Sequence, residues 1–181
     1  MAQYYYLVAS LPLLFYDSVS APSHEEFLVT CRPLLTPQHY RLLVCAGATD
    51  LQGEVTSCEI LDLWRSWEIS LRNELVRLRA KNRGRSPEPY LVESPGVPAP
   101  QAVAREAYAQ DSPLQAEDTL NRARWGYLDE LEVGHYFDIG KVLVYALRLQ
   151  VLARKALFDV DRGGELFDKV YSEIISSVGE N

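Results

Sequence analysis

Glu132 and His135 form the motif Glu-x-x-His, the one pair in this chain with the spacing of metal ligands on a helix. Helical di-iron and di-manganese proteins build their sites from two such motifs on facing helices. A second copy is missing, because neither His24 nor His39 follows a carboxylate by three residues. Gly134 also marks a place where a helix is expected to end. We therefore favour a polar junction between helices, in which His135 pairs with a nearby carboxylate or caps the last carbonyls.

Other kinds of catalytic site lack their sequence signals. Gly47 and Gly53 are not followed by the lysine and threonine of a phosphate-binding loop, and the chain has no Gly-x-Gly-x-x-Gly motif. The cysteines Cys31, Cys45 and Cys58 are odd in number and widely spaced, which fits neither a disulfide framework nor a zinc knuckle. We predict that they are reduced core thiols in a cytosolic protein, and that the chain is not an enzyme and needs no cofactor or metal.

Separation of charge is the strongest signal for binding. The formal net charge is −7, which argues against a general binder of nucleic acid or anionic membranes, because both need a positive field. No aromatic side chains that could stack on bases are interleaved with the main basic cluster. Separated charge suits docking to a protein partner in one orientation. The predicted partner-binding residues are the basic Arg77, Arg79, Lys81 and Arg83 and the acidic Asp129, Glu130 and Glu132.

Hydrophobic periodicity predicts an all-α protein with long amphipathic helices. Residues 57–81 place leucines and Trp64 at a helical a/d spacing, which Glu68 interrupts once. Such a helix would be about 37 Å long, so one of its ends is expected to project from a compact bundle. Residues 4–11 are expected to be a helix that ends at Pro12, with a strand as the alternative because of their aromatic residues. Helices are also expected after the Ser23 capping box and after residues 36–37.

Residues 139–158 are expected to form the central helix of a bundle, because they are apolar around most of the helix circumference. Lys141, Arg148 and Lys155 recur at intervals of seven and form the one face expected to meet solvent. The longest apolar run, residues 142–147, is far shorter than the roughly 18 residues of a membrane span. The bundle is therefore expected to be soluble, or to be completed by a partner.

Prolines divide the chain. Residues 83–100 contain five prolines, and no regular element is expected there. We predict an N-terminal helical part at 1–86, a proline-rich linker or crossover at 87–100 and a C-terminal helical part at 101–181, forming one bundle or two helical lobes. The C-terminal part is expected to contain helices at 101–109 and 113–131, the central helix, and a last helix after a turn at 161–164.

Three segments also carry a family resemblance: Tyr-Tyr-Tyr-Leu-Val-Ala-Ser-Leu-Pro at 4–12, residues 67–81 with Leu-Arg-Asn-Glu-Leu, and Arg-Trp-Gly-Tyr-Leu-Asp-Glu-Leu-Glu at 124–132 with His-Tyr-Phe-Asp at 135–138. With them, nearly the whole chain resembles a bacterial family of unassigned function that is typically encoded among V-type ATPase subunits. A more distant resemblance runs to the C subunit of V-type and archaeal-type ATPases, called d in eukaryotes. Its long helices end in an Asn-x-x-x-x-x-Arg-x-Lys-like stretch, and Asn73, Arg79 and Lys81 stand in comparable places.

The resemblance implies a non-catalytic structural or coupling subunit of a complex that transports protons or sodium ions. Its partners would be other V-type ATPase subunits, namely the central shaft and the membrane c-ring, between which it would transmit torque. It would lie in the cytoplasm at the inner face of the membrane, and would meet the membrane only through the complex. An assembly or regulatory adaptor is the alternative function, and a metal-binding helical enzyme is the third.

Overall fold

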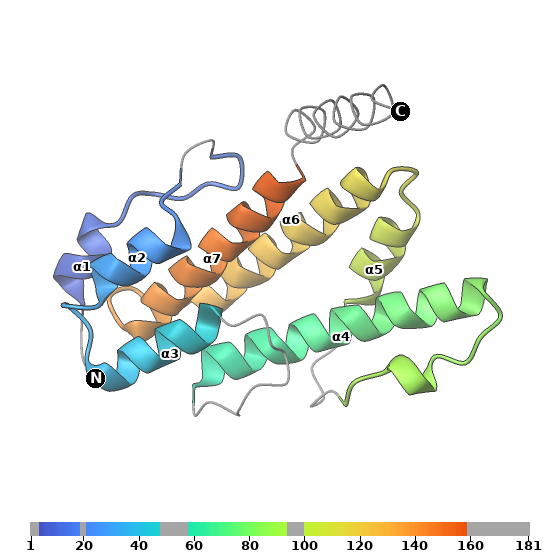
Figure 1. The fold of residues 1–181 in the computed structure, drawn as a ribbon, viewed down its shortest axis with the longest axis horizontal. Coiled ribbons are helices and arrows are strands. Elements are labelled where there is room, and N and C mark those ends of the chain that lie inside the picture. The colour runs from blue at the N-terminus through green and yellow to red at the C-terminus, as the bar shows by residue number, and fades with distance from the viewer. Residues whose placement is uncertain (1–3, 19–20, 48–57, 94–99, 159–181) are drawn as a thin grey trace, which may run out of the picture.

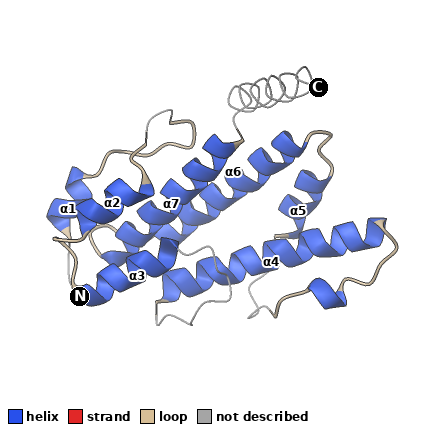
Figure 2. Cartoon of the chain, in the orientation of Figure 1, coloured by secondary structure: helices blue, strands red, loops and turns tan. Residues whose placement is uncertain are grey.

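The computed structural model describes residues 4–18, 21–47, 58–93 and 100–158. These residues contain seven α-helices, one 3₁₀ helix and no strand, which confirms the all-α prediction (Figures 1 and 2). None of these helices is long and apolar enough to cross a membrane. The last predicted helix, after residue 164, lies outside this part of the chain. The helices are α1 (Tyr5–Ser10), α2 (His24–Cys31), α3 (Pro37–Gly47), α4 (Glu59–Asn82), the 3₁₀ helix η1 (Glu88–Tyr90), α5 (Gln101–Tyr108), α6 (Pro113–Glu132) and α7 (Ile139–Leu157).

Local signals explain where these helices begin. The Ser23 hydroxyl accepts the Glu26 N–H and the Glu26 carboxylate accepts the Ser23 N–H, so the predicted capping box starts α2. Thr36 caps α3 by accepting the His39 N–H at 3.3 Å. Residues 5–10 are helical, as favoured over a strand. The prediction that no regular element occurs at 83–100 was wrong for the single turn η1, because proline fixes φ near the value that a 3₁₀ turn needs.

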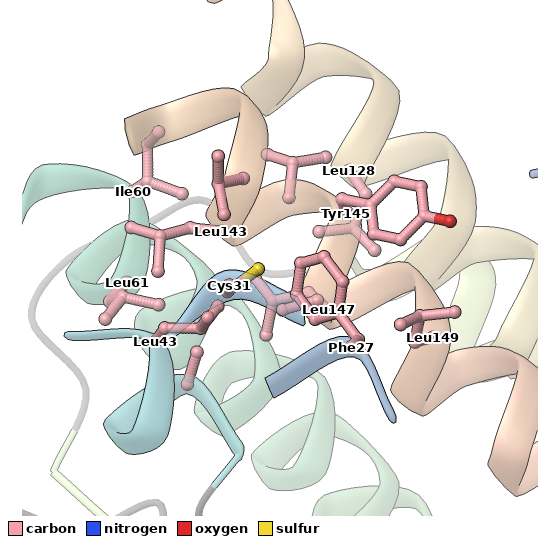
Figure 3. Close-up of a cluster of buried hydrophobic side chains, with 14 of the residues drawn as sticks. Phe27, Cys31, Leu43, Ile60, Leu61, Leu128, Leu143, Tyr145, Leu147 and Leu149 are labelled. Carbon is pink, nitrogen blue, oxygen red and sulfur yellow. The ribbon is translucent and has the colours of Figure 1, made fainter. Parts of the chain in front are cut away.

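The larger hydrophobic core surrounds α7. Residues 142–147 are all buried, and the close-up in Figure 3 shows side chains of α7 meeting those of several other helices. This arrangement matches the central helix predicted from the apolar circumference of 139–158. The partners of α7 in this core include Phe27 and Cys31 of α2, Leu43 of α3, Ile60 and Leu61 of α4 and Leu128 of α6.

A second, smaller core joins α4 to α5 and α6. It contains Trp67 and Leu71 of α4, and Ala104, Ala107 and Leu120 of the other two helices. Both cores draw side chains from either side of residues 87–100. The division of the chain at 87–100 stays a prediction, but it does not coincide with the division between the two cores.

An ion pair between α4 and α6 lies beside these cores. The Arg124 Nε donates to Glu68 at 2.6 Å, and its Nη1 donates to Asn121 at 2.9 Å and to Glu117 at 3.2 Å. Only 9% of the Arg124 side chain is exposed. Glu68 interrupts the a/d pattern of α4 because its position faces this arginine and not an apolar neighbour.

The C-terminal end of α4 extends past α5, as expected for a helix of this length (Figure 1). Gly84 ends the helix with φ +61°, a backbone conformation that side chains with a Cβ rarely adopt. The Arg85 N–H then donates to the Ala80 carbonyl at 2.9 Å, and the Gly84 N–H donates to the Lys81 carbonyl at 3.2 Å. These two bonds form a Schellman motif, which turns the chain back along α4.

We expect the substitution Arg124→Met to lower the free energy of unfolding by about 2–4 kcal/mol, because it leaves the Glu68 carboxylate half-buried without its cation. Urea denaturation followed by circular dichroism measures this loss. The matched control is Arg122→Met, which removes an exposed ion pair with Asp118 on the same helix and should cost under about 1 kcal/mol. Equal losses in the two variants would show that the Arg124 ion pair does not hold α4 on α6.

Candidate functional site

The predicted basic residues lie together at the projecting end of α4. Arg79, Lys81 and Arg83 are exposed, and within the described part of the chain none of them has an ion pair. Arg77 is exposed as well, but it pairs with Glu74 one helical turn before it. The structure therefore leaves three of the four predicted basic residues with their charge available to a partner.

This basic end is held in place by Asn73, which is 4% exposed. Its side-chain Nδ2 donates to the Val92 carbonyl at 2.7 Å, and its Oδ1 accepts the Val92 N–H at 3.0 Å. A backbone amide needs both a donor and an acceptor, and an asparagine side chain supplies both. The chain after α4 is thereby fixed against the same helix that carries the arginines.

The predicted acidic residues are mostly engaged inside the molecule. Glu132 accepts two hydrogen bonds from Arg148, at 2.8 and 3.0 Å, and pairs with Lys141. Asp129 also pairs with Arg148, at 2.5 Å. Glu130 is exposed, and it forms no ion pair among the residues described. Of the three predicted acidic docking residues, only Glu130 keeps its charge for a partner.

These ion pairs cover the polar stripe of α7. Arg148 has only 12% of its side chain exposed and lies over the Trp125 ring, with 5.3 Å from its guanidinium carbon to the ring centroid. Lys155 reaches the Asp17 carboxylate at 2.9 Å. The stripe is therefore only partly exposed: Arg148 is largely covered, while the Lys141 and Lys155 side chains are 31% and 35% exposed.

His135 belongs to the junction between α6 and α7. Its Nδ1 lies 2.7 Å from the Asp138 carboxylate, which also accepts the Lys141 N–H at 3.1 Å and so caps α7. Partial burial alone would raise the pKa of Asp138, but these hydrogen bonds lower it below its usual value. Pairing with a carboxylate is what the polar-junction interpretation predicts. Among the described residues, no group of three or more histidines, cysteines and carboxylates lies close enough to hold a metal.

Burial also limits the reactivity of Cys31, whose side chain lies in the larger core. Desolvation raises the pKa of this thiol to about 12. The nucleophilic form of cysteine is the thiolate, so Cys31 is almost entirely in its unreactive form at neutral pH.

An exposed apolar surface lies where α1 meets the junction between α6 and α7. We call it the aromatic patch, and it consists of Tyr5, Tyr6, Val133, Tyr136 and Phe137. Tyr6 is 77% exposed and Tyr136 is 72% exposed, while the Tyr5 and Phe137 rings pack at 4.6 Å between centroids. Charge patterns did not indicate this patch, although three consecutive tyrosines at the start of a short helix cannot all face one core.

Residues 102–178 match the model of a family described as a protein of unknown function (DUF2764). The matched region includes α6, α7 and their junction, and it covers less than half of the chain. No curated protein and no solved structure matches the sequence.

The ion pairs of Glu132 predict a dependence of stability on pH. Burial alone would raise the pKa of Glu132, but the hydrogen bonds from Arg148 and Lys141 lower it below the usual value. The stability that Glu132 contributes is therefore present above about pH 4.3, which is the pKa of a glutamate in an unfolded chain. It is lost as the pH falls through the lower pKa that Glu132 has in the folded protein. We expect Glu132→Gln to cost about 1–2 kcal/mol at pH 7 and to match the unsubstituted protein below that window.

Chemical denaturation at a series of pH values measures this difference. Glu130→Gln is the control, because it removes the same charge two residues away without breaking an ion pair in the described structure. A similar loss in the control, or a loss for Glu132→Gln that persists in acid, would contradict the role assigned to Glu132.

The Asn73 contact predicts a local effect. Asn73→Ala removes both hydrogen bonds to Val92, so we expect the Val92 amide to exchange its hydrogen faster and stability to fall by about 1–2 kcal/mol. Hydrogen exchange followed by mass spectrometry measures the rate of amide exchange in the segment that contains Val92. Asn82→Ala, an exposed position on the same helix, should change neither quantity. Unchanged exchange in Asn73→Ala would show that the segment is held by other contacts.

Proposed function

We propose that this protein is a non-catalytic coupling subunit of a V-type ATPase, which links two other components of the complex. The observation that carries the proposal is the presence of two unlike surfaces at opposite ends of the molecule. The basic end of α4 lies at one end, and the aromatic patch beside α1 lies at the other (Figure 1). A protein that connects two partners needs two separate surfaces, and different chemistry at each one keeps the partners from exchanging places.

The construction of the molecule between the surfaces supports this role. α4 takes part in the larger core through Ile60 and Leu61, and in the smaller core through Trp67 and Leu71. Packed cores deform little under load. A displacement at the basic end of α4 would therefore reach the α7 bundle and the aromatic patch with little loss.

The distant resemblance to the C subunit of V-type ATPases, called d in eukaryotes, supports the choice of complex. Asn73, Arg79 and Lys81, on which part of that resemblance depends, all lie in the C-terminal half of α4, where Asn73 fixes the following segment and the two cations are exposed. In this proposal the partners are the central shaft and the c-ring. The protein would then lie at the cytoplasmic face of the membrane and meet it only through the complex.

Co-purification of a tagged version with the native ATPase tests the proposal, with the number of copies per complex as the measurement. We expect one copy per complex, which is lost together with the central shaft and not with the catalytic head. Substoichiometric or transient association would favour an assembly or regulatory adaptor, and the absence of association would contradict both functions.

We expect the double substitution Arg79→Glu with Lys81→Glu to weaken association with the complex by about tenfold or more, because it reverses two exposed charges without touching either core. The measurement is the recovery of the complex at low salt. The control Arg41→Glu makes the same kind of change on the exposed face of α3, far from the basic end of α4 (Figure 1). Equal recovery for the two variants would remove the basic end of α4 from the docking surface.

A further inference from the structure

A pocket of about 650 Å³ lies between the C-terminal end of α4 and the segment that turns back along it. The walls are basic, since four arginines line it. Glu74, Glu88 and Glu93, the acidic residues nearest to its lining in the sequence, are not part of that lining. The remaining lining is apolar. The lining residues are Arg72, Val76, Arg79, Ala80, Arg83, Arg85, Pro89, Tyr90, Leu91 and Val92.

Nothing in the described part of the chain neutralises these arginines. Arg72, Arg79, Arg83 and Arg85 form no ion pair there, although the chain as a whole carries a net charge of −7. Glu88 is engaged by the Ser86 hydroxyl. Guanidinium groups bind carboxylates in a two-point geometry, so the lining suits an acidic ligand that supplies several carboxylates.

The floor of the pocket specifies more than negative charge. This floor consists of the apolar lining residues, of which Val76, Leu91 and Val92 are partly buried, while the neighbouring Tyr90 is 61% exposed. A plain anion such as phosphate would leave this apolar surface in contact with water. A ligand with an apolar side chain between its carboxylates would cover the floor and the arginines together.

We propose that this pocket binds an acidic peptide segment of a partner protein, with an apolar side chain in the pocket and flanking carboxylates on the arginines. The proposal rests on the docking role proposed above for the basic end of α4, and it names the chemistry of the partner. A nucleic acid or an anionic membrane fits less well, since the net negative charge of the chain repels an extended polyanion while a short acidic segment meets only the local arginines.

The hydrogen bonds that hold the pocket favour a preformed site. The Schellman motif fixes Arg85 at the end of α4, and Asn73 fixes Val92 at the far end of the turned-back segment. Both walls are therefore in place before a ligand arrives, so less ordering is needed on binding.

Fluorescence anisotropy of the purified full-length chain tests the proposal. The probe is a short labelled peptide in which glutamates flank single leucines, compared with one peptide that has glutamine for every glutamate and another that has serine for every leucine. We expect the probe to bind, and each altered peptide to bind about tenfold or more weakly. Absence of probe binding at low ionic strength would overturn the proposal, as would equal binding by either altered peptide.

Protein variants place the binding in this pocket. Arg83→Gln with Arg85→Gln should weaken probe binding about tenfold or more, whereas Arg32→Gln with Arg41→Gln should change it by about twofold or less. The second pair is the matched control, because it also removes two exposed arginines but neither of them lines the pocket. Equal effects of the two changes would overturn the site.

Inorganic triphosphate and vesicles with anionic lipid serve as competitors. If triphosphate displaces the probe when it supplies the same concentration of negative charge as the probe, the pocket is a general anion site. If the vesicles compete more strongly than triphosphate does, the pocket binds a membrane surface. Either result overturns the peptide proposal. Because these measurements use the isolated chain, they are independent of co-purification with the ATPase, so failure of one proposal can be told apart from failure of the other.

Discussion

The ion pair between Arg124 and Glu68 is the contact on which the arrangement of α4 depends. A guanidinium with so little contact with water needs nearly all of its donors satisfied, and Glu68, Glu117 and Asn121 satisfy them. Because Glu68 belongs to α4 and the other two partners belong to α6, this requirement fixes how the two helices lie against each other. The Trp67 ring stacks on Tyr127 of α6 at 4.9 Å beside the pair, and so excludes water from it.

The helix positions were largely predictable from the sequence because they depend on local chemistry. The capping box at Ser23, the cap at Thr36 and the apolar circumference of α7 are properties of a few neighbouring residues, and the structure contains all three. The single-turn helix η1 was missed because the prolines of residues 83–100 were taken only as residues that interrupt helices. The ion pairs of the α7 stripe were missed for a different reason: the partners Asp17, Asp129 and Glu132 lie on other segments, and no periodicity indicates pairing.

The candidate site shows the same limit. Clusters of charge in the sequence predict that the basic residues at the end of α4 lie together, since they occupy consecutive turns of one helix, and their docking role stays a prediction. The same reasoning treated Glu132 as a docking residue, whereas two cations of α7 engage it. Nothing in the local sequence indicates that Glu132, and not Glu130, pairs with the cations of α7, and only the fold shows it. Asn73 was noticed through a family resemblance, and its role in fixing Val92 depends on a segment that returns to it from 19 residues away.

In mechanical terms, α4 is a beam with two supports and an overhang. Its 24 residues span about 36 Å, with one support at Ile60 and Leu61 and the second from Trp67 to Leu78. The remainder, to Asn82, forms an arm of about 6 Å beyond the second support. A sideways force at the tip of this arm produces a turning moment about that support, beside which the Arg124–Glu68 pair lies. The pair thus stands near the fulcrum of a lever, and its strength sets how much load the arm carries before α4 separates from α6.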